Sequence, residues 1–258
     1  MDKQNVEIQA IPAFSDNYIW LIRGHGRACA VVDPGDHRPV MEELERQDLE
    51  LAHVLITHHH PDHTGGLRGL LKKYPANVTG PRDSRISDLT RVVAEGDVVA
   101  LPELGMELAV LEVPGHTRSH IAFYGDGALF CGDTLFSIGC GRLFEGSAEQ
   151  MQSSLDKFSA LPPQTRIYCA HEYTQSNCRF ALQVEPGNTA LQTRAREVDD
   201  ARTRGERTVP STLADELAAN PFMRTRATDV VNAARKFNPD VSAGAETMAV
   251  IRAWKDRF

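Results

Sequence analysis

Four histidines and one aspartate fall within six consecutive positions of this 258-residue chain, from His58 to His63. They directly follow an apolar run at residues 51–56 that predicts a strand. Two histidines two positions apart on an extended segment point the same way. Imidazoles with a carboxylate form a donor set that suits Zn²⁺ or Fe²⁺ without any thiolate. A chance polar loop would have the same composition, so a metal site needs support from elsewhere in the chain.

Three further residues of ligand type occur in a similar local context. His116, Asp133 and His171 each stand two or three positions beyond the end of a predicted strand. Binding sites of layered α/β folds are built at such strand ends, because the loops converge there. The full set of candidate ligands is His58, His60, Asp62, His63, His116, Asp133 and His171. Seven ligands are too many for one tetrahedral zinc ion and suit two divalent ions that share one carboxylate.

The elements that must position these residues change character along the chain. Short β-branched runs separated by Gly and Pro predict strands in the first two thirds, and apolar residues spaced three and four apart predict helices between them. The predicted strands are residues 17–23, 28–32, 51–57, 107–113, 120–124, 128–131 and 166–169. The predicted helices are residues 40–47, 64–74 and 147–158, with Ser147 as N-cap and Gln150 completing a capping box.

No strand is predicted after about Tyr173. Residues 188–207, 212–219, 228–236 and 243–254 have helical patterns. We therefore expect two domains: residues 1–170 as a layered α/β (α+β) domain with helices on its outer faces, and residues 171–258 as a small all-helical C-terminal domain.

The composition excludes several classes of protein. Asp and Glu (35) outnumber Lys and Arg (28), and the net charge of −7 argues against a nucleic-acid partner. The apolar runs are far shorter than the ~20 residues that span a bilayer, so we expect no membrane partner. The first five residues lack a secretory signal pattern, and the five cysteines include no Cys-x-x-Cys pair. We expect a cytoplasmic monomer with reduced thiols, of which Cys29, Cys131 and Cys169 are small buried hydrophobes.

Other catalytic schemes lack their motifs. The sequence has no Gly-x-Ser-x-Gly nucleophile elbow, no phosphate-binding loop of the Gly-x-x-x-x-Gly-Lys type and no Gly-x-Gly-x-x-Gly fingerprint. This leaves the histidine and aspartate cluster as the candidate catalytic site.

The seven candidate ligands resemble those of the metallo-β-lactamase superfamily, and the rest of the chain narrows the resemblance to the glyoxalase II (hydroxyacylglutathione hydrolase) family. The further stretches that are similar to that family are FSDNY (14–18), CGDTLF (131–136), GCGR (139–142), HEYT (171–174), NPFMR (220–224) and RAWKD (252–256). The resemblance implies a four-layer αβ/βα sandwich followed by a helical glutathione-binding domain. It also implies that His58, His60 and His116 hold one metal, that Asp62, His63 and His171 hold the other, and that Asp133 bridges the two.

The same resemblance implies a reaction and a substrate. Two divalent ions, expected to be zinc with iron or manganese also compatible, lower the pKa of bound water to about 7 and polarise a carbonyl. The implied reaction is hydrolysis of S-D-lactoylglutathione to D-lactate and glutathione, by attack of the metal-bridging hydroxide. The implied glutathione contacts are Arg142, Phe144, Tyr173, Arg252 and Lys255. Arg252 and Lys255 are three apart on a predicted helix and so share a face.

One departure from the family pattern and one alternative function remain open. Phe144 stands where the family often has Tyr, which keeps an aromatic wall but loses a hydrogen bond worth about 0.5–1.5 kcal/mol. A persulfide dioxygenase with one Fe²⁺, or another hydrolase of the same fold, is the alternative function.

The remaining polar residues near strand ends have simpler interpretations. Asp33 is either the partner of a ligand histidine or a turn residue. The other histidines are not expected to be ligands: His59 alternates away from the metal side, His120 begins a strand, and His25, His37 and His53 are turn or surface residues.

Overall fold

A six-stranded mixed sheet forms one side of the first of two compact units in the computed structural model, which describes residues 6–258. The first unit extends to Glu112 and also includes Ser119–Gly132, and the second consists of Val113–Arg118 and Asp133–Phe258. Residues 1–5, on which the expectation about a secretory signal rests, lie outside the described part. Among the described residues, no helix is both long and apolar enough to cross a membrane.

The sheet of the first unit has its strands in sequence order. They are β1 (Glu7–Ala13), β2 (Asn17–Arg23), β3 (Ala28–Val32), β4 (Glu50–Leu55), β5 (Asn77–Pro81) and β6 (Arg91–Val93). The first three strands pair antiparallel, and β3 to β6 pair parallel. The predictions for β2 and β3 are confirmed to the residue. The third predicted strand is confirmed as β4, which ends two residues earlier than expected.

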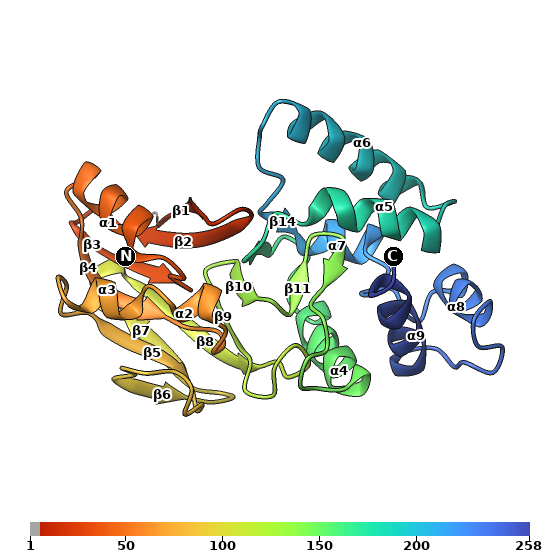
Figure 1. The fold of residues 1–258 in the computed structure, drawn as a ribbon, viewed down its shortest axis with the longest axis horizontal. Coiled ribbons are helices and arrows are strands. Elements are labelled where there is room, and N and C mark those ends of the chain that lie inside the picture. The colour runs from red at the N-terminus through yellow and green to blue at the C-terminus, as the bar shows by residue number, and fades with distance from the viewer. Residues whose placement is uncertain (1–5) are drawn as a thin grey trace. The chain divides into compact units, whose positions relative to one another are not determined.

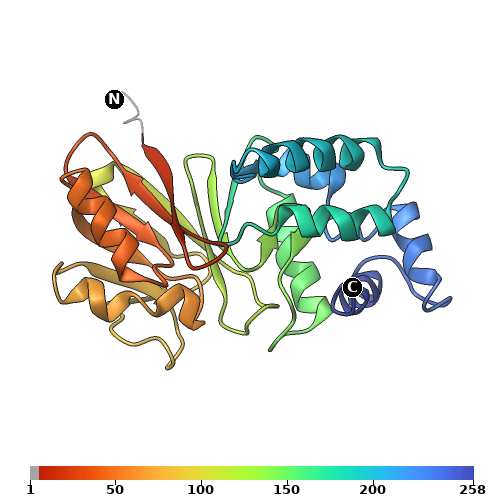
Figure 2. The same cartoon turned by 45° about the horizontal axis from the view of Figure 1, so that its top comes forward.

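Helices α1 (His37–Arg46), α2 (Pro61–Thr64) and α3 (Leu67–Leu71) belong to the same unit (Figure 1). Val40 of α1 and Leu67 of α3 share one core cluster with Leu21 and Val31 of the sheet, so burial of apolar side chains holds these helices against it. Both views show α1 and α3 running alongside the strands (Figure 2).

The single helix predicted over residues 64–74 is wrong, because the chain breaks between α2 and α3 at Gly65 and Gly66. A Cβ on Gly66 would lie 2.5 Å from the carbonyl oxygen of Pro34. The break therefore packs the backbone against the segment that follows β3, a tertiary contact that the local pattern does not contain.

An antiparallel meander completes the first unit. It consists of β7 (Val98–Leu101), the short 3-10 helix η1 (Pro102–Leu104), β8 (Met106–Glu112), β9 (Ile121–Gly125) and β10 (Ala128–Gly132). The strands predicted at residues 107–113, 120–124 and 128–131 agree with β8, β9 and β10 to within one residue at each end.

The second unit is mostly helical. Its elements are β11 (Leu135–Phe136), β12 (Gly139–Cys140), α4 (Ala148–Ser159), β13 (Arg166–Cys169), α5 (Thr174–Val184), α6 (Thr189–Thr203), β14 (Ser211–Thr212), α7 (Leu213–Ala219), α8 (Thr228–Arg235) and α9 (Ala245–Lys255). The predicted capping box of Ser147 and Gln150 is confirmed at the start of α4.

Two features of the second unit differ from the sequence-based expectation. The prediction of no strand after Tyr173 is wrong, because Ser211 and Thr212 form β14, which pairs with β13. Helix α5 was not predicted; it begins directly after Tyr173, which makes no side-chain capping bond. The five cysteines of the described residues are buried, as expected for Cys29, Cys131 and Cys169, and none of them forms a disulfide bond.

Candidate active site

In the first unit, the candidate ligands lie between the end of β4 and helix α2. The Ile56 amide donates to the Thr79 carbonyl oxygen at 2.8 Å, which prolongs the extended path of β4. His58 and His60 then approach each other, with Nε2 of His58 3.0 Å from Nδ1 of His60. His60 is the N-cap residue of α2, so Asp62 and His63 lie in its first turn.

Asp33 supports this loop from the end of β3. Its carboxylate accepts from the Thr57 amide at 2.8 Å and from the Thr57 hydroxyl at 2.7 Å. Its Oδ2 is 3.0 Å from Nδ1 of His63, so a proton on Nδ1 directs Nε2 toward a metal. Asp33, His58 and His63 each offer a ligand-type atom within 4.8 Å of one another. Of the two interpretations left open for Asp33, the geometry favours the partner of a ligand histidine.

Asp62 is held by the hairpin between β1 and β2. Nδ2 of Asn17 donates to Oδ2 of Asp62 at 3.1 Å, and the same carboxylate oxygen is 3.4 Å from Nε2 of His63. Gly35 allows this close packing, since a Cβ there would lie 1.9 Å from the Asp62 carbonyl oxygen.

The histidines that were not expected to be ligands have other contacts. Nδ1 of His59 is 3.5 Å from Oδ2 of Asp83. His120 is fully buried and stacks on His58, with ring centroids 4.5 Å apart. The expectation of a turn or surface position for His53 is wrong: it is buried on β4, and its Nε2 lies 2.9 Å from a carboxylate oxygen of Glu103.

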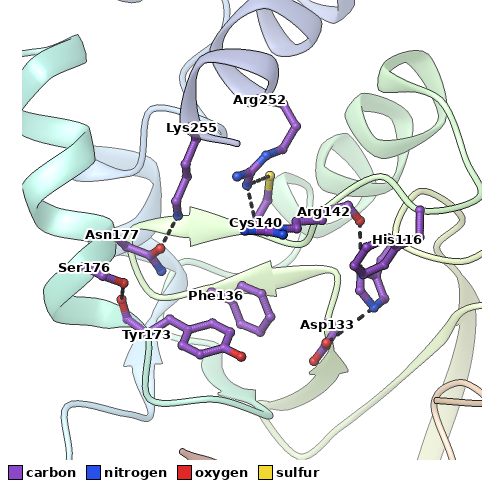
Figure 3. A pocket seen from close by; sticks show the side chains of 11 residues that line it. His116, Asp133, Phe136, Cys140, Arg142, Tyr173, Ser176, Asn177, Arg252 and Lys255 are labelled. Atoms are coloured by element: carbon purple, nitrogen blue, oxygen red, sulfur yellow. Dashed lines mark hydrogen bonds and ion pairs between the residues drawn. The ribbon is translucent and has the colours of Figure 1, made fainter. Parts of the chain in front are cut away.

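In the second unit, Asp133 lies between two histidines. Its Oδ2 is 3.4 Å from Nε2 of His116 and its Oδ1 is 3.4 Å from Nε2 of His171. Nδ1 of His116 is 2.9 Å from the Arg142 carbonyl oxygen (Figure 3). That carbonyl can only accept, so Nδ1 carries the proton and Nε2 is left as an electron-pair donor on the side of Asp133.

These two groups of residues fit divalent metal ions. In both groups, imidazole nitrogens lie close to carboxylate oxygens. Nδ1 of His63 contacts the Asp33 carboxylate, and Nδ1 of His116 contacts the Arg142 carbonyl oxygen. Such partners fix the tautomer and the orientation of ligating histidines in metal sites. The chemistry of the donor set suits zinc, iron and manganese alike.

A cavity of about 460 Å³ opens beside Asp133 and His116 within the second unit. Its lining combines an aromatic wall with three cations. The lining residues are His116, Asp133, Phe136, Cys140, Arg142, Phe144, Tyr173, Ser176, Asn177, Arg252 and Lys255 (Figure 3). The structure thus brings together all five residues that the sequence resemblance implies for glutathione.

The aromatic wall of the cavity packs against the candidate ligands His171 and His116. Tyr173 stacks on His171 with ring centroids 4.6 Å apart, and Phe136 meets both of these rings edge-on. Phe144 is 62% exposed and stands edge-on to His116 at 5.2 Å. Phe144 therefore presents an exposed apolar ring to any molecule in the cavity.

Two cations of the cavity, Arg252 and Lys255, lie on α9, and the third, Arg142, lies in the loop after β12. Nη1 of Arg252 donates to the Cys140 carbonyl oxygen at 2.9 Å and Nη2 to Asp256 at 3.0 Å. Lys255 donates to Oδ1 of Asn177. Burial, with a smaller contribution from the neighbouring Arg252 guanidinium, lowers the pKa of Lys255 to about 7.

Sequence reasoning missed four lining residues: Phe136, Cys140, Ser176 and Asn177. Ser176 and Asn177 are three and four positions after Tyr173, the spacing that places side chains on one helix face. Recognition of α5 would therefore have placed both beside Tyr173.

Comparison with known proteins agrees with this geometry. Residues 13–171 match the family model described as the metallo-beta-lactamase superfamily, which defines the class of protein. Residues 172–258 match the model described as hydroxyacylglutathione hydrolase C-terminus. The chain therefore belongs to the hydroxyacylglutathione hydrolase family of that superfamily, and the family predicted from the sequence is confirmed.

Individual relatives support the same assignment. The chain is 49% identical to the hydroxyacylglutathione hydrolase of Cupriavidus metallidurans over 98% of its length and 99% of the relative's. It is 51% identical to the hydroxyacylglutathione hydrolase of Photobacterium profundum, with 97% and 99% covered. Among solved structures, ETHE1 from Myxococcus xanthus is similar with a TM-score of 0.66 and 24% identity, covering 96% of this chain and 98% of that one. That likeness shows the fold alone, and it agrees with the expected metallo-β-lactamase fold.

Proposed function

We propose that this protein hydrolyses S-D-lactoylglutathione, and S-2-hydroxyacylglutathione thioesters in general, to the hydroxy acid and glutathione. This is the second step of methylglyoxal detoxification. The observation that carries the proposal is one cavity in which Asp133 and His116 stand beside an aromatic wall and the cations Arg252 and Lys255. Relatives about half identical over nearly the full chain bear the name of this activity.

We also propose the metal ligands. One divalent ion would be held by His58, His60, His116 and Asp133, and a second by Asp62, His63, His171 and Asp133. The placement of Asp133 between two imidazoles and the contact of Asp33 with His63 support this assignment. When bound, two such ions supply hydroxide near neutral pH and polarise the thioester carbonyl. Zinc is the expected metal, and iron or manganese suits the same donors.

The residues of the chain bind and orient the substrate. Glutathione carries two carboxylates, which match the positive charges of Arg142, Arg252 and Lys255. Tyr173 offers a hydroxyl group and Phe144 an apolar wall. The leaving thiolate of glutathione has a parent pKa near 8.5, so it departs without a strong general acid.

The proposed metal ligands and glutathione contacts are distributed over the two expected domains. Residues 1–170 supply most metal ligands, and residues 171–258 supply Tyr173, Arg252 and Lys255. Arg142 and Phe144 precede that boundary, so glutathione recognition draws on both parts of the sequence. The proposal places the enzyme in the cytoplasm as a monomer that acts on a small molecule, without nucleic-acid or membrane partners. The net charge of −7 and the buried cysteines, which form no disulfide bond among the described residues, support this placement.

Thioester hydrolysis tests the proposed function. Metal-loaded protein should consume S-D-lactoylglutathione, followed by the loss of thioester absorbance, and should release one thiol per turnover. The same preparation should consume no oxygen with glutathione persulfide. Oxygen consumption without thioester turnover would favour the dioxygenase alternative.

A further inference from the structure

The turn between β11 and β12 holds a residue in an unfavourable backbone conformation. Only Ser137 and Ile138 join the two strands, and Ile138 has a φ of +58°. Positive φ in a tight turn is normally left to Gly or Asn, and a β-branched residue is strained there. Such strain persists only where the surroundings over-determine the conformation. The turn therefore needs an external support.

Three buried side chains supply that support, and we call Asn177, Glu216 and Asn220 the turn clamp. Oε2 of Glu216 accepts from the Ile138 amide at 2.8 Å. Nδ2 of Asn177 donates to the Ser137 carbonyl oxygen at 2.9 Å. Each side chain of the clamp is at most 2% exposed.

Asn220 closes the clamp across the two strands. Its Nδ2 lies 3.2 Å from the Phe136 carbonyl oxygen and 3.0 Å from that of Gly139, the paired residues on either side of the turn. The same amide is 2.9 Å from Oε2 of Glu216. The clamp thus binds backbone groups of all four residues from Phe136 to Gly139. Asn177 lies on α5, Glu216 on α7, and Asn220 is the C-cap residue of α7.

The turn that the clamp holds has a cavity-lining residue on each side. Phe136, before the turn, meets the rings of His171 and Tyr173. Cys140, after the turn, provides the carbonyl that accepts from Arg252 (Figure 3). Glu216 and Asn220 do not line the cavity themselves. The contacts of Glu216 lead to the cavity through the turn. Asn220 also accepts from the Phe222 amide at 3.0 Å, and the Phe222 ring lies against Arg252 and Lys255.

We propose that Glu216 and Asn220 are positioning residues for the glutathione thioester, because they hold the strained Ser137–Ile138 turn that sets Phe136 and Cys140 in the cavity. The inference rests on the proposed function, and it assigns to α7 a role in substrate binding. Asn177 lines the cavity and contacts Lys255 directly. Its substitution would therefore change the cavity directly as well as through the turn.

The test compares Glu216→Ala with the conservative Glu216→Gln, which keeps an oxygen acceptor for the Ile138 amide. Glu216→Ala should raise KM for S-D-lactoylglutathione roughly tenfold, with kcat within about twofold, as expected when binding contacts are lost equally in ground and transition states. Glu216→Gln should restore KM to near that of the parent protein. Asn220→Ala should show the KM pattern of Glu216→Ala and serves as the second variant if Glu216→Ala fails to fold.

Glu185 offers a matched control. It is equally buried in the second unit, but its carboxylate pairs with Arg224 and contacts no residue of the cavity. Glu185→Ala should lower the melting temperature and leave KM unchanged. If all of these variants shift KM in proportion to their loss of stability, the clamp has only a structural role and the proposal is overturned.

A binding experiment separates this proposal from the proposed function. Titration calorimetry of the metal-loaded protein with glutathione should show weaker binding to Glu216→Ala than to the parent protein. Equal affinities would overturn the clamp and leave the proposed function intact. Absence of glutathione binding to the parent protein, together with absence of thioester turnover by the metal-loaded protein, would overturn the function and the clamp with it.

Discussion

Lys255 should make the strength of substrate binding depend on pH. The amine interacts with four titratable side chains: Arg252, Asp256, Cys140 and Cys178. Burial, aided by Arg252, lowers the pKa of Lys255 to about 7. The side chain is therefore charged below pH 7 and neutral above it. A substrate carboxylate binds the charged form, so KM for S-D-lactoylglutathione should rise as the pH passes through 7.

The size of the effect follows from the pKa. About nine tenths of Lys255 is protonated one unit below its pKa and about one tenth one unit above it. A hydrogen bond to a charged group contributes about 1.5–3 kcal/mol, so the neutral form binds at least about tenfold more weakly. KM should then increase about five- to tenfold between about pH 6 and pH 8, because the neutral form still binds weakly and one tenth of Lys255 stays charged at pH 8. The value of kcat should not follow this titration, because a contact remote from the reacting carbonyl stabilises ground and transition states equally.

Initial rates measured across that pH range, with two variants, test this reasoning. Lys255→Met should have a high KM at every pH, because its side chain is never charged. Lys255→Arg keeps its charge throughout and should lose the rise near pH 7. The reasoning is refuted if KM of the parent protein is constant from about pH 6 to pH 8, or if Lys255→Met shows the same rise.

Three further substitutions test other parts of the account. Arg252→Ala should raise KM with kcat nearly intact in steady-state assays, and an unchanged KM would mean that the substrate carboxylate binds elsewhere. Asp33→Asn should weaken metal affinity about 10–100-fold, because it removes the charge that orients His63; equal affinity in chelator competition would contradict this role. Burial raises the pKa of Glu216 above its ordinary value of 4.5, so the unfolded chain releases this proton first and stability falls as the pH rises between the two values. Glu216→Gln should therefore gain stability relative to the parent protein as the pH rises above 4.5 in denaturant titrations, and a difference that stays constant with pH would show that the fold does not raise this pKa.

The candidate ligands could be predicted because their signal is local. Each one follows a strand whose β-branched pattern is plain in the sequence, and strand ends of such folds gather their loops. The ligand-type residues and the family were therefore accessible from the sequence. The break between α2 and α3 was not, because it results from the close approach of Gly66 to Pro34, some thirty positions earlier.

The clamp could not be predicted, because its contacts join positions far apart in the chain. Glu216 meets Ile138 across 78 positions, and no local pattern records that pairing. Ile138 itself is a typical strand residue, so its sequence context hides the positive φ. His53 was misassigned for a related reason: its partner Glu103 is 50 positions away, and a histidine with a distant partner can be buried in a strand.

Elemental analysis of protein purified without added metal, paired with a thioester assay on the same sample, tests the central claim most directly. The account predicts about two divalent ions per chain, loss of S-D-lactoylglutathione hydrolysis when a chelator removes them, and recovery when metal is restored. Full turnover by protein that holds less than one ion per chain would contradict it.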